Sequence, residues 1–200
     1  MQIPLSKVLE RVGDYFLKKS SIHLAVERLS QTLKEMGIPF AVVGALAVNA
    51  HGHVRTTGDV DILLRRDDLS RFKDRWIGRG WVNKFEGSRG FRDAIELVDI
   101  DVLIAGDFPG DGAPKPVAFP DPANIPLNEV DGYPVLPLTM LMELKIASGM
   151  TTVHRPRDLD DAIQLIRCNG LARDYAFQLN EYVRPMFEQL WNAAQIREDY

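Results

Sequence analysis

Two pairs of aspartates stand out because each pair sits in an apolar stretch. Asp59 and Asp61 open one apolar run, and Asp99 and Asp101 alternate with apolar residues in another. Residues at i and i+2 of a strand share a face of the sheet, so each pair would place two carboxylates side by side. Packing alone explains such strands poorly, because isolated carboxylates are expensive to bury. The pairs predict a site for a hard divalent cation, since all the donors are oxygens and no His or Cys cluster accompanies them.

An alternative interpretation of the aspartates and several roles for the nearby histidines stay open. An exposed edge strand would also alternate polar and apolar residues. His51 and His53 are too few to form a zinc site by themselves. A histidine at this helix end could instead contact a nucleotide, whereas His23 and His154 are expected to be structural.

A glycine turn precedes the first aspartate pair. The strand expected over Phe40–Val43 runs into Gly44, and a helix of small residues is expected over Ala45–His51. A glycine turn that opens a helix can offer backbone N–H groups to phosphate oxygens. In the loop that follows, Arg55 and Thr57 are candidates for phosphate, sugar or loop-bracing contacts. The alternative for the arginine is a simple brace on an acid.

Composition limits the classes of function. The chain has 200 residues, a single cysteine (Cys168) and a formal net charge of −4, so a dedicated duplex-DNA binder is not expected. One cysteine excludes an internal disulfide framework and fits a reducing, cytoplasmic compartment. No apolar run approaches about 18 residues, so no membrane span is expected. Between Arg65 and Arg92 there is a local excess of five positive charges. This is either a solvated surface or a basic wall for phosphates or RNA.

The remaining pattern predicts an α/β N-terminal part (1–136) followed by a C-terminal helical region (137–200) packed on it. Further helices are expected at Leu5–Lys19, Ile22–Met36, Leu69–Ile77 (with Asp67 and Asp68 as N-cap candidates), Leu138–Ser148, Arg157–Cys168 and Leu171–Trp191, the last broken by Pro185. Further strands are expected at Val60–Leu64, Trp81–Phe85, Arg89–Ile95, Leu97–Ile104 and Tyr133–Leu136, with a long loop over Gly106–Pro126. Trp76, Trp81 and Phe85 are expected in the core.

The motifs together resemble a known superfamily. Gly44-Ala45, then Arg55-x-Thr57-x-Asp59-x-Asp61, then an apolar strand around Asp101, resembles the nucleotidyltransferases with the polymerase-beta-type fold. Within them, the chain is most similar to the minimal bacterial kind, including abortive-infection toxin nucleotidyltransferases. The core resemblance runs from about Phe40 to Ile104, and a weaker one lies in Leu138–Ile166.

The resemblance implies a mixed sheet flanked by helices, with Mg²⁺ (or Mn²⁺) and an NTP such as ATP bound. Asp59 and Asp61 would hold both metal ions and the triphosphate. Asp101 would bind the catalytic ion and act as general base on the attacking hydroxyl.

Phosphate contacts are implied for Gly44, Ala45 and Lys145. Many members have Gly-Ser or Gly-Gly at the turn, whereas Ala45 keeps its N–H but offers no hydroxyl. Lys145 would bind phosphate or balance the acids, and the alternative is a helix lysine extended to solvent. Asp158 and Asp161 are expected as helix-start charges.

The expected activity is transfer of an NMP group from an NTP to an acceptor hydroxyl. The acceptor stays open among a small molecule such as an aminoglycoside, a protein side chain and a tRNA 3′ end. The alternatives are a non-catalytic nucleotide-binding or interaction module of the same fold, and a metal-dependent phosphodiesterase. An antitoxin partner is a further expectation from the resemblance.

Overall fold

The fold is built on one mixed sheet. The computed structural model describes residues 20–152 and 156–196. Seven strands form the sheet in the order β3-β4-β5-β2-β1-β7-β6. Their bounds are β1 (Ala41–Val42), β2 (Asp59–Leu64), β3 (Trp81–Asn83), β4 (Phe91–Asp93), β5 (Asp99–Ile104), β6 (Asn128–Val130) and β7 (Tyr133–Val135). The two long strands, β2 and β5, are parallel neighbours, whereas β1 is antiparallel to β2. The mixed sheet expected from the resemblance is therefore confirmed.

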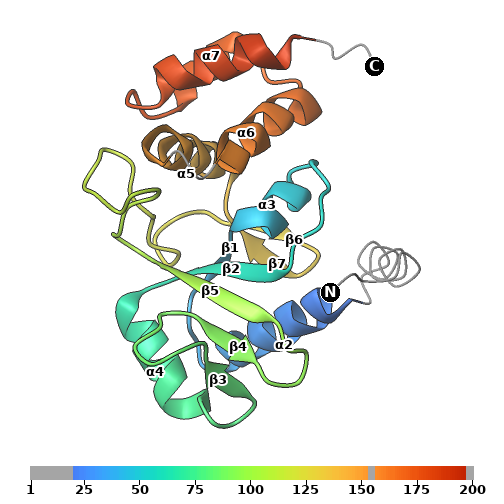
Figure 1. The fold of residues 1–200 in the computed structure, drawn as a ribbon, viewed down its shortest axis with the longest axis vertical. Helices are drawn as coiled ribbons and strands as arrows, with labels where there is room; N and C mark the ends of the chain where they lie inside the picture. The colour runs from blue at the N-terminus through green and yellow to red at the C-terminus, as the bar shows by residue number, and fades with distance from the viewer. Residues whose placement is uncertain (1–19, 153–155, 197–200) are drawn as a thin grey trace, which may run out of the picture.

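Helices flank the sheet and gather at one end of it (Figure 1). They are α2 (Ser21–Glu35), α3 (Gly44–Ala50), α4 (Arg66–Trp76), α5 (Leu138–Thr151), α6 (Pro156–Asn169), the 3-10 helix η1 (Arg173–Gln178) and α7 (Arg184–Ala194). The helices α5, α6 and α7 lie together, in orange and red, at the end opposite α4 and β3. Helix α3 contacts both β2 and α5, so it links the sheet to the C-terminal helices. None of the helices in the described ranges is long and apolar enough to cross a membrane.

The core explains why β2 and β5 can carry acids. Ile62, Leu64, Ile100 and Ile104 are all at most 1% exposed, and they anchor the two strands between the helical layers. Burying large aliphatic side chains stabilises the fold by about 1.5–3 kcal/mol each. The aspartates occupy the alternate positions of β2 and β5 that stay partly exposed. Packing on one face thus fixes the direction in which the carboxylates point.

A second part of the core lies under β3 and β4. Trp81 and Phe91 pack with Phe72 of α4 through close ring contacts, which confirms the core position expected for Trp81. Trp76 is partly buried against the core. The same expectation is wrong for Phe85, which is 67% exposed. Phe85 lies beyond the end of β3, where the chain turns outward.

Several boundaries differ from expectation. Helix α4 begins at Arg66, so Asp67 and Asp68 lie in its first turn rather than at its cap. Strand β6 is not expected from apolar periodicity. It forms a hairpin with β7 through Asp131 and Gly132, both at positive φ, and an Asp-Gly pair is a known signal for such a turn. Pro185 lies in the first turn of α7 rather than breaking a longer helix, because the N–H groups of the first turn make no hydrogen bond within the helix. The expected helix Leu5–Lys19 and His154 lie outside the described residues.

A candidate metal and nucleotide site

The two aspartate pairs face each other across neighbouring strands. The parallel register of β2 and β5 places Asp59 opposite Asp99 and Asp61 opposite Asp101. Strand β5 is not at an edge, since β4 pairs with its other side. The interpretation as an exposed edge strand is therefore wrong. Four carboxylates lie on two adjacent strands in the middle of the sheet, between the C-terminal helices and the β3–β4 end.

Asp61 lies against the start of α3. Gly44 has a φ of +59°, and a Cβ at this position would overlap the Oδ2 atom of Asp61. Only glycine combines that backbone conformation with the close approach. Burial, followed by the charge of Asp59, raises the pKa of Asp61 to about 6, while Lys145 opposes the rise. Asp61 is thus a carboxylate whose ionised form lacks enough positive charge around it, which is the condition that a bound cation relieves.

A buried ion-pair network stands behind Asp61, on α5 and α6. Lys145 Nζ lies 2.7 Å from an oxygen of Asp158 and 2.8 Å from one of Asp161. Arg55 donates two hydrogen bonds to Asp161, at 2.8 and 2.9 Å. Asp161 is fully buried. Burial opposes its ionisation, but the bonds from Arg55 and the charge of Lys145 hold the pKa of Asp161 below its usual range.

This network changes the expected roles of several residues. Arg55 braces its loop on Asp161, as in the alternative interpretation. The side chain of Asn49 holds the same loop, because it donates a hydrogen bond to the carbonyl oxygen of Arg55 and accepts one from the Arg55 N–H. Asp158 and Asp161 do more than start a helix, since they fix the ammonium group of Lys145. The charged pattern around them gave no sign that Asp161 would be buried.

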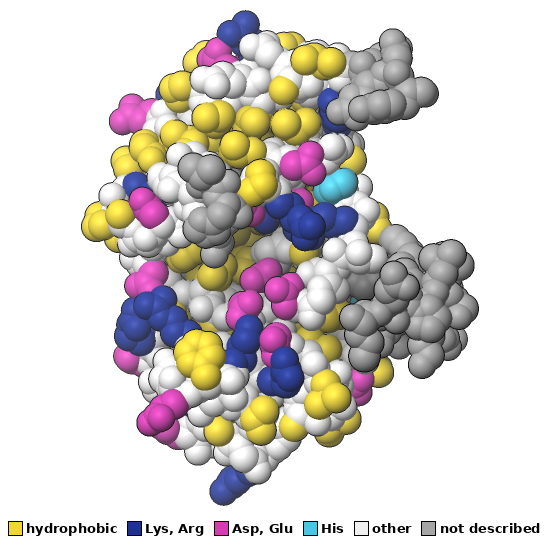
Figure 2. Space-filling model, viewed as in Figure 1, with side chains coloured by type: hydrophobic (Ala, Val, Ile, Leu, Met, Phe, Trp, Pro, Cys, Tyr) yellow, Lys and Arg dark blue, Asp and Glu magenta, His cyan; other side chains and the backbone are white. Residues whose placement is uncertain are grey.

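A small cavity joins this network to the carboxylates. It has a volume of about 150 Å³ and is lined by Gly44, Asp61, Lys145, Ser148 and Asp158, among others. Lys145 therefore borders the same space as Asp61. Ala45 follows Gly44 in the first turn of α3, where the backbone N–H groups have no hydrogen-bond acceptor within the helix. Figure 2 shows the acidic side chains gathered in the middle of this face, with Lys and Arg on both sides.

The carboxylates of Asp59 and Asp101 each accept a hydrogen bond from a neighbouring side chain. Thr57 donates a hydrogen bond to Oδ1 of Asp59 at 2.6 Å. Lys84 donates to Oδ1 of Asp101 at 2.8 Å. Neither contact was expected, although Thr57 was a candidate for loop bracing and Lys84 belongs to the basic stretch. The hydrogen bond with Arg92 also lowers the pKa of Asp99, with Lys84 adding to the effect.

The donor set suits a hard cation. Within residues 20–152 and 156–196, no group of three His, Cys, Asp or Glu side chains is already arranged to hold a metal ion. The convergence of Asp59, Asp61 and Asp101 on one metal ion stays a prediction. The available ligands are nonetheless carboxylate oxygens on adjacent strands, which fit Mg²⁺ or Mn²⁺. His51 is engaged elsewhere, since its Nε2 lies 2.8 Å from the carbonyl oxygen of Leu136.

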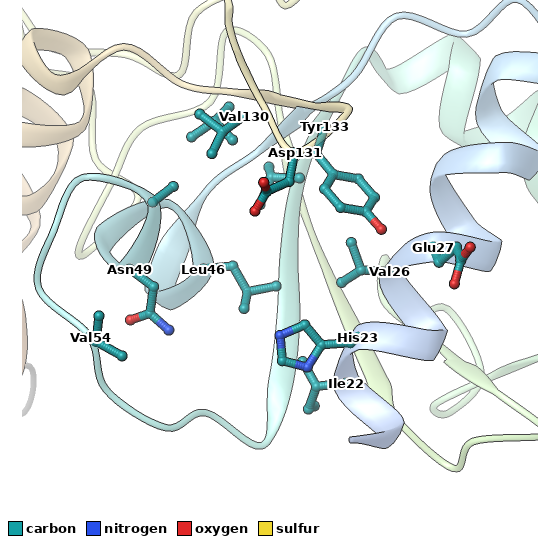
Figure 3. Close-up of a pocket in the computed structure, with 13 residues that line it drawn as sticks. Ile22, His23, Val26, Glu27, Leu46, Asn49, Val54, Val130, Asp131 and Tyr133 are labelled. Carbon is teal, nitrogen blue, oxygen red and sulfur yellow. The ribbon is translucent and has the colours of Figure 1, made fainter. Parts of the chain in front are cut away.

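A larger pocket of about 560 Å³ lies on the other side of α3 (Figure 3). Its walls include Ile22 and Val26 of α2 and Leu46 of α3, and Tyr133 of the β6–β7 hairpin closes one side. It is mostly apolar and contains none of the β2 or β5 aspartates. Asp61 and Lys145 thus border the smaller cavity and not the larger one.

Comparison with solved structures identifies the fold. The crystal structure of ANT(2″)-Ia in complex with adenylyl-2″-tobramycin is similar to this chain with a TM-score of 0.50 and 14% identity, over 83% of this chain and 96% of the other. The solution structure of the antibiotic-resistance factor ANT(2″)-Ia matches with a TM-score of 0.50 and 16% identity, over 84% and 91% of the two chains. No protein-family model matches the sequence, and no curated protein matches it. The chain thus has the fold of the aminoglycoside nucleotidyltransferases, a mixed sheet with flanking helices.

Proposed function

We propose that the chain is a nucleotidyltransferase that depends on Mg²⁺ or Mn²⁺ and moves an NMP group from an NTP to an acceptor hydroxyl. The observation that carries the proposal is the register of β2 and β5, which sets Asp61 directly opposite Asp101. The fold shared with ANT(2″)-Ia supports it. The raised pKa of Asp61 supports it as well, because a bound cation would offset the burial and the charge of Asp59 that disfavour the ionised form of this carboxylate.

Each acid has a distinct part in this proposal. Asp59, Asp61 and Asp101 would hold the divalent ions, which neutralise the triphosphate and the leaving pyrophosphate when bound. Asp101 accepts the proton of the acceptor hydroxyl. The acceptor oxygen then forms a bond to the α-phosphorus as the bond from that phosphorus to the bridging oxygen breaks. The products are an NMP-modified acceptor and pyrophosphate.

The cavity beside Asp61 supplies the phosphate contacts. Lys145 borders this space, held by Asp158 and Asp161. Two acids that clamp one ammonium group keep it charged and fix its position, as a phosphate ligand requires. Gly44 lines the same space, and the missing hydroxyl at the next residue, Ala45, removes one phosphate contact. Arg55 acts behind Lys145 as a brace, and Thr57 orients Asp59.

The acceptor class is the open part of the proposal. One structural neighbour was solved with adenylyl-2″-tobramycin, which makes a cationic small molecule one candidate. The local excess of positive charge between Arg65 and Arg92 favours an acceptor that carries phosphate, such as tRNA. An antitoxin partner is compatible with either acceptor and stays a prediction.

A direct experiment can find the acceptor. The purified protein is incubated with each of the four α-labelled NTPs, Mg²⁺ or Mn²⁺, and a cell extract separated into RNA, protein and small-molecule fractions. The proposal predicts label in one fraction only with divalent ion, and none with Asp61→Asn. Binding of NTP without label in any fraction would favour the non-catalytic module of the same fold.

A further inference from the structure

Lys84 lies directly after β3 and reaches both carboxylates of β5. Its Nζ atom is 2.8 Å from Oδ1 of Asp101 and 3.5 Å from Oδ2 of Asp99. Its side chain is 24% exposed, so the contact is partly shielded from solvent. Arg92 occupies the other oxygen of Asp99, at 2.6 Å. The ammonium group therefore lies between Asp101, to which it donates a hydrogen bond, and Asp99, whose Oδ1 atom contacts Arg92 while its Oδ2 atom faces Lys84.

The chain makes room for Lys84 at Gly90. A Cβ on Gly90 would lie 2.9 Å from Cδ of Lys84, 3.1 Å from Oδ1 of Asp101 and 2.7 Å from the carbonyl oxygen of Ile100. Gly90 is not among the glycines at positive φ, so space rather than backbone conformation is the reason for glycine here. Any larger residue would press the lysine stem away from Asp101. The contact is thus built into the fold, between the segment that joins β3 to β4 and strand β5.

We propose that Lys84 is a built-in counter-ion of the acid site, and that a divalent ion has to displace it from Asp101 in order to bind. This inference rests on the metal site of the proposed function. An ammonium group and a divalent ion that share one carboxylate repel each other, because both carry positive charge at short range. Asp99 provides the place to which the ammonium group moves, since its Oδ2 atom is already 3.5 Å away. Asp99 would then be the receiver of Lys84 rather than a metal ligand.

Mn²⁺ binding tests the displacement. The free Mn²⁺ signal is measured by electron paramagnetic resonance for the wild type, Lys84→Met, Arg92→Met and Asp61→Asn. Lys84→Met removes the competitor and should tighten binding by roughly three- to fivefold, the upper scale of a partly exposed ion pair. Arg92→Met is the matched control, since it removes the same charge from the neighbouring carboxylate and should change binding by no more than about twofold.

The outcomes separate the two proposals. Equal or weaker binding in Lys84→Met, with binding lost in Asp61→Asn, overturns the inference and leaves the metal site in place. Wild-type binding in Asp61→Asn shows that the metal does not bind at these carboxylates and overturns both. If Arg92→Met tightens Mn²⁺ binding as much as Lys84→Met does, the loss of any nearby positive charge explains the effect, and the displacement is overturned as well.

Chemical labelling gives an independent readout. The rate of acetylation of Lys84 is compared with that of Lys34, an exposed lysine that bonds the Gly132 carbonyl oxygen in the β6–β7 turn. Mg²⁺ should raise the relative rate at Lys84 in the wild type, because displacement breaks its bond to Asp101. It should have no effect in Asp61→Asn. Unchanged or slower labelling of Lys84 with Mg²⁺ in the wild type would contradict the displacement.

Discussion

Replacing Asp61 by asparagine should stabilise the metal-free protein near neutral pH. The pKa of Asp61 is raised from 3.8 to about 6, first by burial and then by the charge of Asp59. A raised pKa in the folded state contributes stability that is complete below pH 3.8 and is lost as the pH rises through about 6. The rise of this pKa from 3.8 to about 6 corresponds to at most about 3 kcal/mol at neutral pH, because Asp61 also keeps some contact with solvent. Asparagine has the same shape without the charge, so the variant avoids this loss.

Thermal unfolding with a chelator measures the effect. At about 2–4 °C per kcal/mol for a chain of this size, Asp61→Asn should melt up to about 10 °C above the wild type near pH 7.5 and close to it near pH 4. Asp160→Asn is the matched control, since Asp160 is an exposed acid on α6 and should change little at either pH. Added Mg²⁺ should raise the melting temperature of the wild type but not that of Asp61→Asn. An Asp61→Asn protein that is no more stable than the wild type near pH 7.5 would show that the charge of Asp61 does not destabilise the metal-free fold.

Three further predictions follow from the same geometry. Asp161→Asn should cost about 3–5 kcal/mol in urea unfolding, because it leaves two cations without their shared buried partner, whereas Asp160→Asn should cost nearly nothing. Gly44→Ala should lower the melting temperature and abolish NMP transfer, because its Cβ overlaps the carboxylate that the glycine faces; activity close to wild type would show that α3 can move aside. Asp101→Asn should lower turnover by about two to four orders of magnitude while NTP binding by calorimetry persists, and Asp99→Asn should do much less. The reverse order between these two would exchange their roles.

The sequence predicted the elements whose apolar pattern is strong. The strands β2 and β5 were expected, since each alternates or runs apolar after an Asp-x-Asp pair, whereas the register that places Asp61 opposite Asp101 comes from the folded chain. The helices α2 and α6 were also expected within two residues of their observed ends. In each case, one periodic face is buried and decides the structure locally.

The partners of the charged groups could not be predicted in the same way. Lys84 reaches Asp101 across 17 residues, and Arg55 reaches Asp161 across 106, so only the folded chain brings them together. An exposed charge and a buried, paired charge look alike in a sequence, which is why Asp161 was expected at a helix start. The β6–β7 hairpin is different, because its Asp-Gly turn could have been recognised in the sequence. The strands were instead predicted from apolar periodicity, which did not indicate β6.

The central claim is that Asp61 and Asp101 support transfer of the α-phosphoryl group. The most direct measurement compares NTP labelled at the α-phosphate with NTP labelled at the γ-phosphate, in the presence of Mg²⁺ and the acceptor fraction. We expect acceptor labelling from the α-label alone, with release of pyrophosphate, and loss of labelling in Asp61→Asn and Asp101→Asn. Acceptor labelling from the γ-phosphate, or undiminished α-labelling in Asp61→Asn, would contradict it.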